Sequence, residues 1–114
     1  MIAQIGKWEG KHSETEYKIG NLGKLDVVWK RIKTGHPSYA FEVQIKGNLY
    51  QALAKLKHAF DLWNSHPVLV TTEQYVTQAE ELLKGSFYEI RNRARVINNE
   101  RYKNYTHSKR SYVN

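Results

Sequence analysis

The sequence predicts a single α/β domain with a mixed central sheet flanked by helices. Three observations lead to this fold class. Short runs rich in β-branched and aromatic residues fill the first part of the chain, a long amphipathic pattern follows them, and a further apolar run then precedes a second helical pattern. Strands that alternate with helices in this way are typical of layered α/β domains.

The composition limits the class of protein. The chain has 114 residues, of which 40% are hydrophobic, so we expect residues 1–114 to form one domain with one modest core. It contains no cysteine, which excludes disulfides, thiolate nucleophiles and cysteine-ligated zinc. No apolar run approaches the roughly 20 residues that span a bilayer, and Met1–Ile5 is too short for the hydrophobic region of a signal peptide. We therefore expect a soluble, cytoplasmic protein without a membrane partner.

Three strands are expected before the first helix. The first covers Glu14–Ile19, and a turn at Asn21–Gly23 connects it to the second, because Asn and Gly tolerate positive φ. The second strand covers Lys24–Ile32, and its nearly continuous apolar character predicts burial on both faces. The third strand covers Tyr39–Lys46, after a loop over residues 34–38.

The helix at Leu49–Trp63 has the clearest pattern in the chain. Apolar residues recur at i, i+3, i+4, i+7, i+10, i+11 and i+14, which is one stripe of an amphipathic helix. Asn48 is its expected N-cap, and Asn64–Pro67 ends it because proline cannot continue a helix. The polar residues of this helix, Lys55 among them, most simply form a solvated face; contact with a phosphate backbone is the functional alternative.

A buried strand at Val68–Thr71 and a second helix to about Leu83 follow. Thr71 or Thr72 is the expected N-cap of this helix, Thr71 with Gln74 has the capping-box spacing, and Gly85 ends the helix. If the strand runs parallel to the preceding one, the long helix is the crossover between them. Further along we expect a short helix over residues 87–93, a last strand over 94–97 and a helix from 98 or 99 to about 108.

The C-terminal part of the same domain, residues 83–114, is strongly basic. It holds eight Lys or Arg residues and two Glu residues, so it carries six of the seven net positive charges. This asymmetry favours a polyanionic partner, nucleic acid first; a basic tail that only aids solubility is the alternative. Aromatic residues lie between these Lys and Arg residues. They could stack on nucleobases, and they could equally form the buried stripe of a last helix.

Two carboxylates stand inside apolar runs. Asp26 is in the second expected strand and Glu42 is in the third, where Glu42, Gln44 and Lys46 share one face because side chains alternate. A buried charge is costly unless it is paired. If the strands are adjacent, both carboxylates can hold Mg²⁺ or Mn²⁺, with the backbone carbonyl of Val43 as a further oxygen ligand. Alternatively, Asp26 forms a salt bridge at a strand end and Glu42 lies on a solvated sheet face.

An aspartate in an apolar strand, then Glu-x-Gln in a second strand followed by a helix, resembles the PD-(D/E)XK nuclease superfamily, which includes type II restriction enzymes and archaeal Holliday-junction resolvases. The resemblance covers roughly residues 14–72. Asp26 matches the metal-binding aspartate, Glu42 matches the first residue of the (D/E)-x-K signature, and Gln44 stands where the lysine is usual. In such enzymes an upstream acidic residue often completes the site, for which Glu16 or Glu14 is the candidate here.

The resemblance implies a restriction-endonuclease-like fold and a metal-dependent endonuclease that hydrolyses DNA phosphodiester bonds as a homodimer. Asp26 and Glu42 would bind the metal, Gln44 would orient the attacking water by hydrogen bonds, and Lys46 would supply the missing positive charge. Contacts with DNA are expected from Lys55, Arg91, Arg93, Arg95, Arg101 and Lys103. A non-catalytic DNA-binding module with a degenerate nuclease site is the alternative. A protein-interaction domain whose basic part binds an acidic partner is a third hypothesis.

Overall fold

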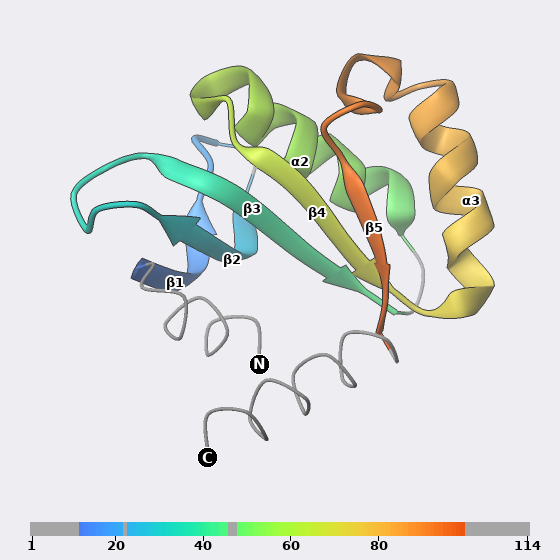
Figure 1. The fold of residues 1–114 in the computed structure, drawn as a ribbon, viewed down its shortest axis with the longest axis horizontal. Coiled ribbons are helices and arrows are strands. Elements are labelled where there is room, and N and C mark those ends of the chain that lie inside the picture. Colours follow the sequence, from blue (N-terminus) through green and yellow to red (C-terminus); the bar gives the residue numbers. More distant parts are fainter. Residues whose placement is uncertain (1–11, 22, 46–47, 100–114) are drawn as a thin grey trace.

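The computed structural model describes residues 12–21, 23–45 and 48–99, which form a mixed α/β fold (Figure 1). The strands are β1 (His12–Lys18), β2 (Lys24–Lys30), β3 (Pro37–Gln44), β4 (His66–Thr71) and β5 (Arg95–Asn98). The helices are α2 (Leu49–Trp63) and α3 (Glu73–Lys84), and the short 3-10 helix η1 (Tyr88–Ile90) follows α3. The α/β class predicted from the sequence is therefore confirmed. None of the described helices is long and apolar enough to cross a membrane.

The five strands form one sheet in the order β1-β2-β3-β4-β5. The pairs β1–β2 and β2–β3 are antiparallel, whereas the pairs β3–β4 and β4–β5 are parallel. Helix α2 connects the parallel neighbours β3 and β4, which confirms the predicted crossover. Consequently β3 is the central strand, and its carboxyl end lies at the same edge of the sheet as those of β4 and β5.

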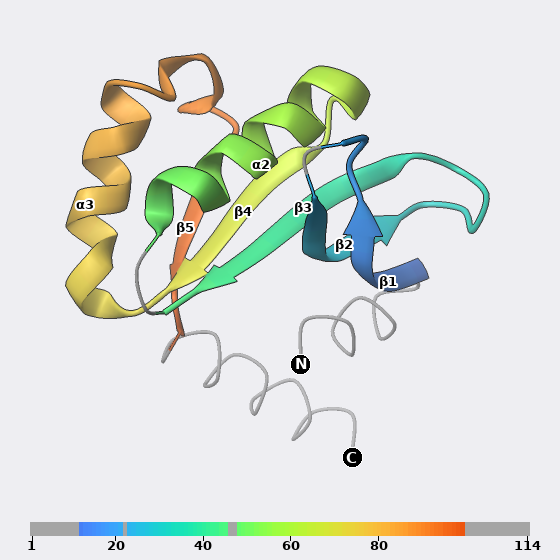
Figure 2. The same ribbon diagram turned by 180° about the vertical axis from the view of Figure 1, so that it is seen from behind.

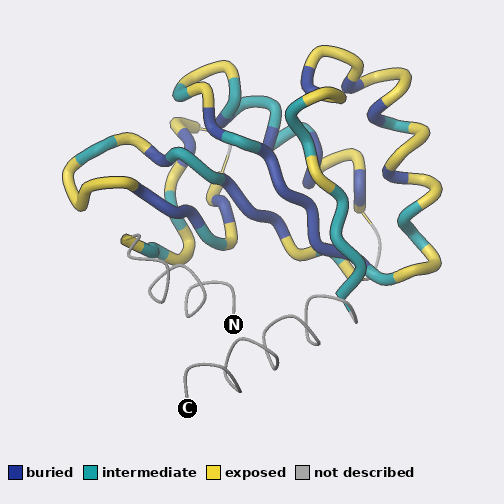
Figure 3. The backbone as a smooth tube through the Cα atoms, viewed as in Figure 1, coloured by how far each residue is buried: buried dark blue, intermediate teal, exposed yellow. Residues whose placement is uncertain are grey.

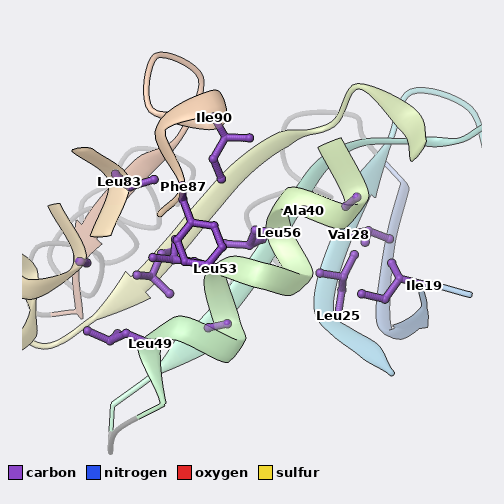
Figure 4. Close-up of a cluster of buried hydrophobic side chains, with 14 residues drawn as sticks. Ile19, Leu25, Val28, Ala40, Leu49, Leu53, Leu56, Leu83, Phe87 and Ile90 are labelled. Atoms are coloured by element: carbon purple, nitrogen blue, oxygen red, sulfur yellow. The ribbon is translucent and has the colours of Figure 1, made fainter. Parts of the chain in front are cut away.

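The main core lies between one face of the sheet and the helices. The apolar stripe of α2, which includes Leu53 and Leu56, packs with Val28, Ala40 and Leu69 from β2, β3 and β4 (Figure 4). Figure 2 shows α2 lying across this face, and Figure 3 shows the nearly continuous burial of the central strands. Because side chains alternate, Glu42 lies on the same face as Ala40 and is therefore directed towards α2.

The opposite face of the sheet carries a second apolar cluster, formed by Trp29, Phe41, Val68 and Val70. Trp29 follows Val28, which belongs to the main core, so β2 is buried on both faces over this part, as its apolar run predicts. β2 nevertheless ends at Lys30 and not at Ile32, whose side chain is 62% exposed. The register with β3 shifts between Trp29 and Lys30, which ends the pairing earlier than the apolar pattern suggests.

The caps of α2 follow the local sequence. The side chain of Asn48 accepts a hydrogen bond from the backbone N–H of Gln51 at 3.0 Å. Asn64 adopts a left-handed conformation with φ of 55° and donates its backbone N–H to the carbonyl of Phe60. Both contacts satisfy backbone groups that a helix end leaves open.

The predicted capping box of α3 is wrong. Thr71 is the last residue of β4, fully buried, and its hydroxyl donates to the carbonyl of Gln44 at 2.6 Å. Thr72, the alternative predicted cap, is the N-cap, although its side chain forms no capping hydrogen bond, and Gly85 is the C-cap as predicted. A contact between neighbouring strands therefore takes the hydroxyl that the local pattern assigned to the helix.

Beyond α3, the short predicted helix over residues 87–93 is a single 3-10 turn at Tyr88–Ile90. The last predicted strand is confirmed as β5. Most of the helix expected from residue 98 or 99 lies outside the described residues.

Candidate active site

Asp26 and Glu42, which we call the acid pair, meet where β2 and β3 separate. Val27 and Phe41 are the last paired residues of the two strands on this side. Beyond them, each carboxylate bonds to the backbone of the other strand. The N–H of Asp26 donates to Oε2 of Glu42 at 2.8 Å, and the N–H of Val43 donates to Oδ2 of Asp26 at 2.7 Å. The two acids are thus held together by reciprocal hydrogen bonds that extend the strand pairing.

Glu42 is buried between the sheet and α2, and a lysine of α2 pairs with it. Only 3% of Glu42 is exposed. The ammonium Nζ of Lys55 lies 2.7 Å from Oε1 of Glu42 and also donates to the carbonyl of Lys24 at 3.2 Å. Asp26 itself is exposed, so the acid pair opens to solvent on the Asp26 side. The result is a cluster of two carboxylates and one ammonium, with one carboxylate removed from water.

Burial controls the ionisation of Glu42. Desolvation raises the pKa of its carboxyl from 4.5 to about 6. The hydrogen bonds from Lys55 and from the Asp26 backbone oppose this rise, and the negative charge of Asp26 adds to it. At pH 7 Glu42 is therefore mostly ionised, although its pKa lies close enough to neutrality for proton binding to matter below pH 6.

The cluster offers the hard oxygen ligands that Mg²⁺ and Mn²⁺ prefer. Within residues 12–21, 23–45 and 48–99, no three His, Cys, Asp or Glu side chains lie close enough to hold an ion by themselves. Mg²⁺ commonly uses one or two carboxylates and takes its remaining ligands from water and substrate phosphates. The acid pair fits that pattern, and the backbone of Val43, whose N–H donates to Asp26, adjoins it. An ion at Oε1 of Glu42 would compete with the ammonium of Lys55.

The structure places the other predicted site residues as follows. Gln44 follows Glu42 on the same face of β3, and its carbonyl is fixed by Thr71. Lys46 lies outside the described residues. Glu16 lies in β1 between two residues that pair with β2, as Thr15 pairs with Val27 and Tyr17 pairs with Leu25. It is therefore the β1 residue next to Asp26. Glu16 is exposed, and its φ angle is 49°.

Glu14, the other upstream candidate, is engaged elsewhere. Its carboxylate lies 2.6 Å from Nζ of Lys30, near the opposite end of β2. Lys30 is buried and also lies over the ring of Tyr17, 4.5 Å from its centroid. Glu14 therefore balances a buried lysine in the β1–β2 hairpin, whereas Glu16 is the acid whose position adjoins the acid pair.

The residues predicted to contact DNA have different surroundings in the structure. Lys55 belongs to the acid-pair cluster, although the amphipathic pattern most simply placed it on the solvated face of its helix. One signal for its position is present in the sequence: Lys55 stands three residues after Ala52 and four before Ala59, two residues of the buried stripe. A lysine beside that stripe can reach the sheet with its ammonium while its stem stays on apolar surface.

Arg91 and Arg95 are exposed, as a nucleic-acid contact requires. Arg93 instead binds within the protein: its guanidinium donates to the side chain and the carbonyl of Asn64 at 3.1 Å, and to His66 at 3.3 Å. These contacts join the segment before β5 to the C-terminal end of α2, so the structure gives Arg93 a structural role. Arg101 and Lys103 lie outside the described residues.

Comparison with known proteins adds no relative. No protein-family model matches the chain, and no curated protein or solved structure is significantly similar to it. The functional assignment therefore depends on the geometry of Asp26, Glu42 and Lys55.

Proposed function

We propose that the protein is a metal-dependent endonuclease of the PD-(D/E)XK type that hydrolyses DNA phosphodiester bonds. One observation carries the proposal: the carboxylates of Asp26 and Glu42, from adjacent strands, each accept a hydrogen bond from a backbone N–H of the other strand, and the Lys55 ammonium pairs with the buried Glu42. An antiparallel strand pair that carries the acids, followed by a crossover helix and a parallel strand, supports the restriction-endonuclease-like arrangement that the resemblance implies.

The residues would divide the chemistry as follows. Asp26 and Glu42 would hold Mg²⁺ or Mn²⁺, with the Val43 carbonyl beside them. When bound, the metal would lower the pKa of a coordinated water and offset phosphate charge. Gln44, on the face of Glu42, would orient the attacking water through its amide. Lys55 would place a positive charge against the negative charge that develops on the phosphate, in a site that burial makes less polar than water.

In this proposal Lys55 supplies the positive charge that the sequence pattern assigned to Lys46, which lies outside the described residues. In the PD-(D/E)XK signature the lysine stands two residues after the glutamate, where this chain has Gln44. The ammonium of Lys55 reaches the same glutamate from α2, at 2.7 Å from Oε1. A lysine from a different element would thereby supply the positive charge that Gln44 lacks. The exposed arginines Arg91 and Arg95 would contact the DNA backbone, and two copies of the chain would cut the two strands.

A cleavage assay tests the proposal. The substrates are supercoiled, linear and four-way-junction DNA, each with Mg²⁺, with Mn²⁺ or with EDTA. Asp26→Asn and Glu42→Gln keep the shape and a hydrogen-bond acceptor at each position, and Glu81→Gln, on the exposed side of α3, is the matched control. We expect metal-dependent cleavage by the wild type and by Glu81→Gln, with a loss of at least about 100-fold in the other two variants. Equal rates in all four proteins would reject the assignment.

A DNA-binding module with a degenerate nuclease site is the second candidate. One observation favours it: both oxygens of Glu42 already accept hydrogen bonds, from Lys55 and from the Asp26 backbone. In that case the protein binds DNA with an affinity that falls steeply with added salt, because backbone contacts release counterions. It would cut none of the three substrates with either metal.

A further inference from the structure

A groove lies between the C-terminal half of α3 and β5, at the edge of the sheet opposite the β1–β2 hairpin. Its volume is about 430 Å³, within the range typical of small-molecule sites. In the sheet order, β4 separates β5 from the strand that carries Glu42. The groove is therefore built from elements that the acid pair does not use. We call it the α3–β5 groove.

The lining of the groove combines apolar and polar side chains. Leu83, Ala94 and Val96 supply apolar surface, and Leu83 also belongs to the main core. Lys84, Arg91 and Asn92 supply two positive charges and one amide. Apolar surface beside convergent polar groups is the usual composition of a ligand site.

The two cations are free to bind an anion. Lys84 and Arg91 are exposed, and within the described part of the chain neither forms a salt bridge with a carboxylate. Glu80, one helical turn before Lys84, also lines the groove without pairing with it. The ammonium and the guanidinium can therefore both turn to a ligand without breaking an internal ion pair.

Tyr88 holds the Arg91 guanidinium in position. The guanidinium carbon lies 3.9 Å from the centre of the Tyr88 ring, and Nη2 donates to the Tyr88 hydroxyl at 3.2 Å. This contact uses one of the five N–H groups of the guanidinium and leaves others for a ligand. A side chain ordered in advance loses less conformational entropy when it binds.

We propose that the α3–β5 groove binds one nucleotide unit, with its phosphate on Lys84 and Arg91 and its base on the apolar surface formed by Leu83, Ala94 and Val96. Arg and Lys are the usual partners of phosphate oxygens. The Asn92 amide and the Glu80 carboxylate provide a donor and acceptors for the polar edge of a base. The negative charge of Glu80 also disfavours ligands with several phosphates.

The nucleotide unit can come from two sources, a free mononucleotide or one residue of a single strand. Calorimetric titration in EDTA distinguishes them, with deoxyadenosine monophosphate in one arm and a short oligodeoxyadenylate in the other. The proteins are the wild type, Arg91→Gln, Lys84→Gln and the charge-matched control Lys18→Gln, which removes an exposed lysine of β1. Each of these side chains is exposed, so the substitutions leave the fold intact, as circular dichroism will verify.

We expect binding in one or both arms, weakened roughly tenfold by Arg91→Gln or Lys84→Gln and unchanged by Lys18→Gln. Binding of the mononucleotide indicates a free nucleotide as ligand, and binding of the oligonucleotide alone indicates a residue of a strand. Deoxyadenosine should bind much more weakly than its monophosphate. The proposal is overturned if neither ligand binds, if deoxyadenosine binds equally well, or if Lys18→Gln has the same effect as Arg91→Gln.

The Glu42→Gln variant separates this proposal from the nuclease assignment. Because the acid pair lies outside the α3–β5 groove, this substitution should abolish cleavage and leave nucleotide binding unchanged. Loss of nucleotide binding in Glu42→Gln would contradict an independent groove, whatever the cleavage assay shows.

Discussion

Replacement of Glu42 by glutamine should change how the stability of the protein depends on pH. The substitution keeps the size of the side chain and an acceptor for the Asp26 N–H, but it removes the titrating carboxyl. In the folded protein the pKa of Glu42 is raised from 4.5 to about 6. Between these values the folded state binds the proton more tightly than the unfolded state does. Glu42 therefore contributes stability below pH 4.5 that is lost as the pH rises through about 6.

The size of this change in stability follows from the shift in the pKa of Glu42. Raising the pKa from 4.5 to about 6 corresponds to about 2 kcal/mol of unfolding free energy. Because only 3% of Glu42 is exposed, solvent screening reduces this figure little. The unfolding free energy of Glu42→Gln, minus that of the wild type, should thus increase by about 2 kcal/mol from pH 4 to pH 8.

Urea unfolding at constant ionic strength, followed by tryptophan fluorescence, measures this difference. The same series with Glu81→Gln controls for the loss of an exposed carboxyl, and we expect its difference from the wild type to stay nearly constant with pH. If the difference in unfolding free energy between Glu42→Gln and the wild type were also constant with pH, burial would not perturb the pKa of the Glu42 carboxyl. A decrease with rising pH would show that the Lys55 ion pair outweighs desolvation and lowers the pKa of Glu42, contrary to the prediction.

Three further predictions concern the same elements. Lys55→Met leaves the Glu42 carboxylate buried without its ion-pair partner, so urea unfolding should show an unfolding free energy lower by about 2 kcal/mol at pH 8 and a smaller reduction at pH 5. An equal reduction at both pH values would mean that the effect does not depend on the charge of Glu42. The rate of metal-dependent DNA cleavage should be constant above pH 7 and fall about tenfold per unit well below pH 6, because protons compete for Glu42. A rate that rises on acidification would contradict that role. Arg93→Gln should lower the unfolding free energy by about 1–2 kcal/mol through lost hydrogen bonds at the end of α2, and should weaken DNA binding no more than Lys18→Gln does; a larger loss of binding would assign Arg93 to the interface.

Much of the fold was predictable because the signals are local. The apolar stripe of Leu49–Trp63 and its cap Asn48 depend on residues within a few positions of one another, and both are confirmed. The proximity of Asp26 and Glu42 was predictable because each stands in an apolar run and the intervening loop is short enough to make the strands neighbours. That both acids take part in the pairing at the point where the strands separate is visible only in the structure.

The remaining features depend on tertiary contacts. Lys55 was assigned to a solvated face because the helix pattern does not reveal that α2 crosses above Glu42. Thr71 matched a capping box, yet its hydroxyl binds the carbonyl of Gln44 in the neighbouring strand. In the sequence, Arg93 is indistinguishable from the other positively charged residues of the basic C-terminal part. In the structure, its hydrogen bonds to Asn64 and His66 join elements far apart in the sequence. In each case a polar group found its partner across the fold and not along the chain.

Binding of Mn²⁺ to the isolated protein, measured by electron paramagnetic resonance of the free ion at pH 7.5, shows whether Asp26 and Glu42 share an ion. We predict one site per chain in the wild type and in Glu81→Gln, with affinity at least about tenfold lower in both Asp26→Asn and Glu42→Gln. If either acid-pair variant bound Mn²⁺ as tightly as the wild type, the two carboxylates would not share an ion, and the proposed catalytic centre would be contradicted.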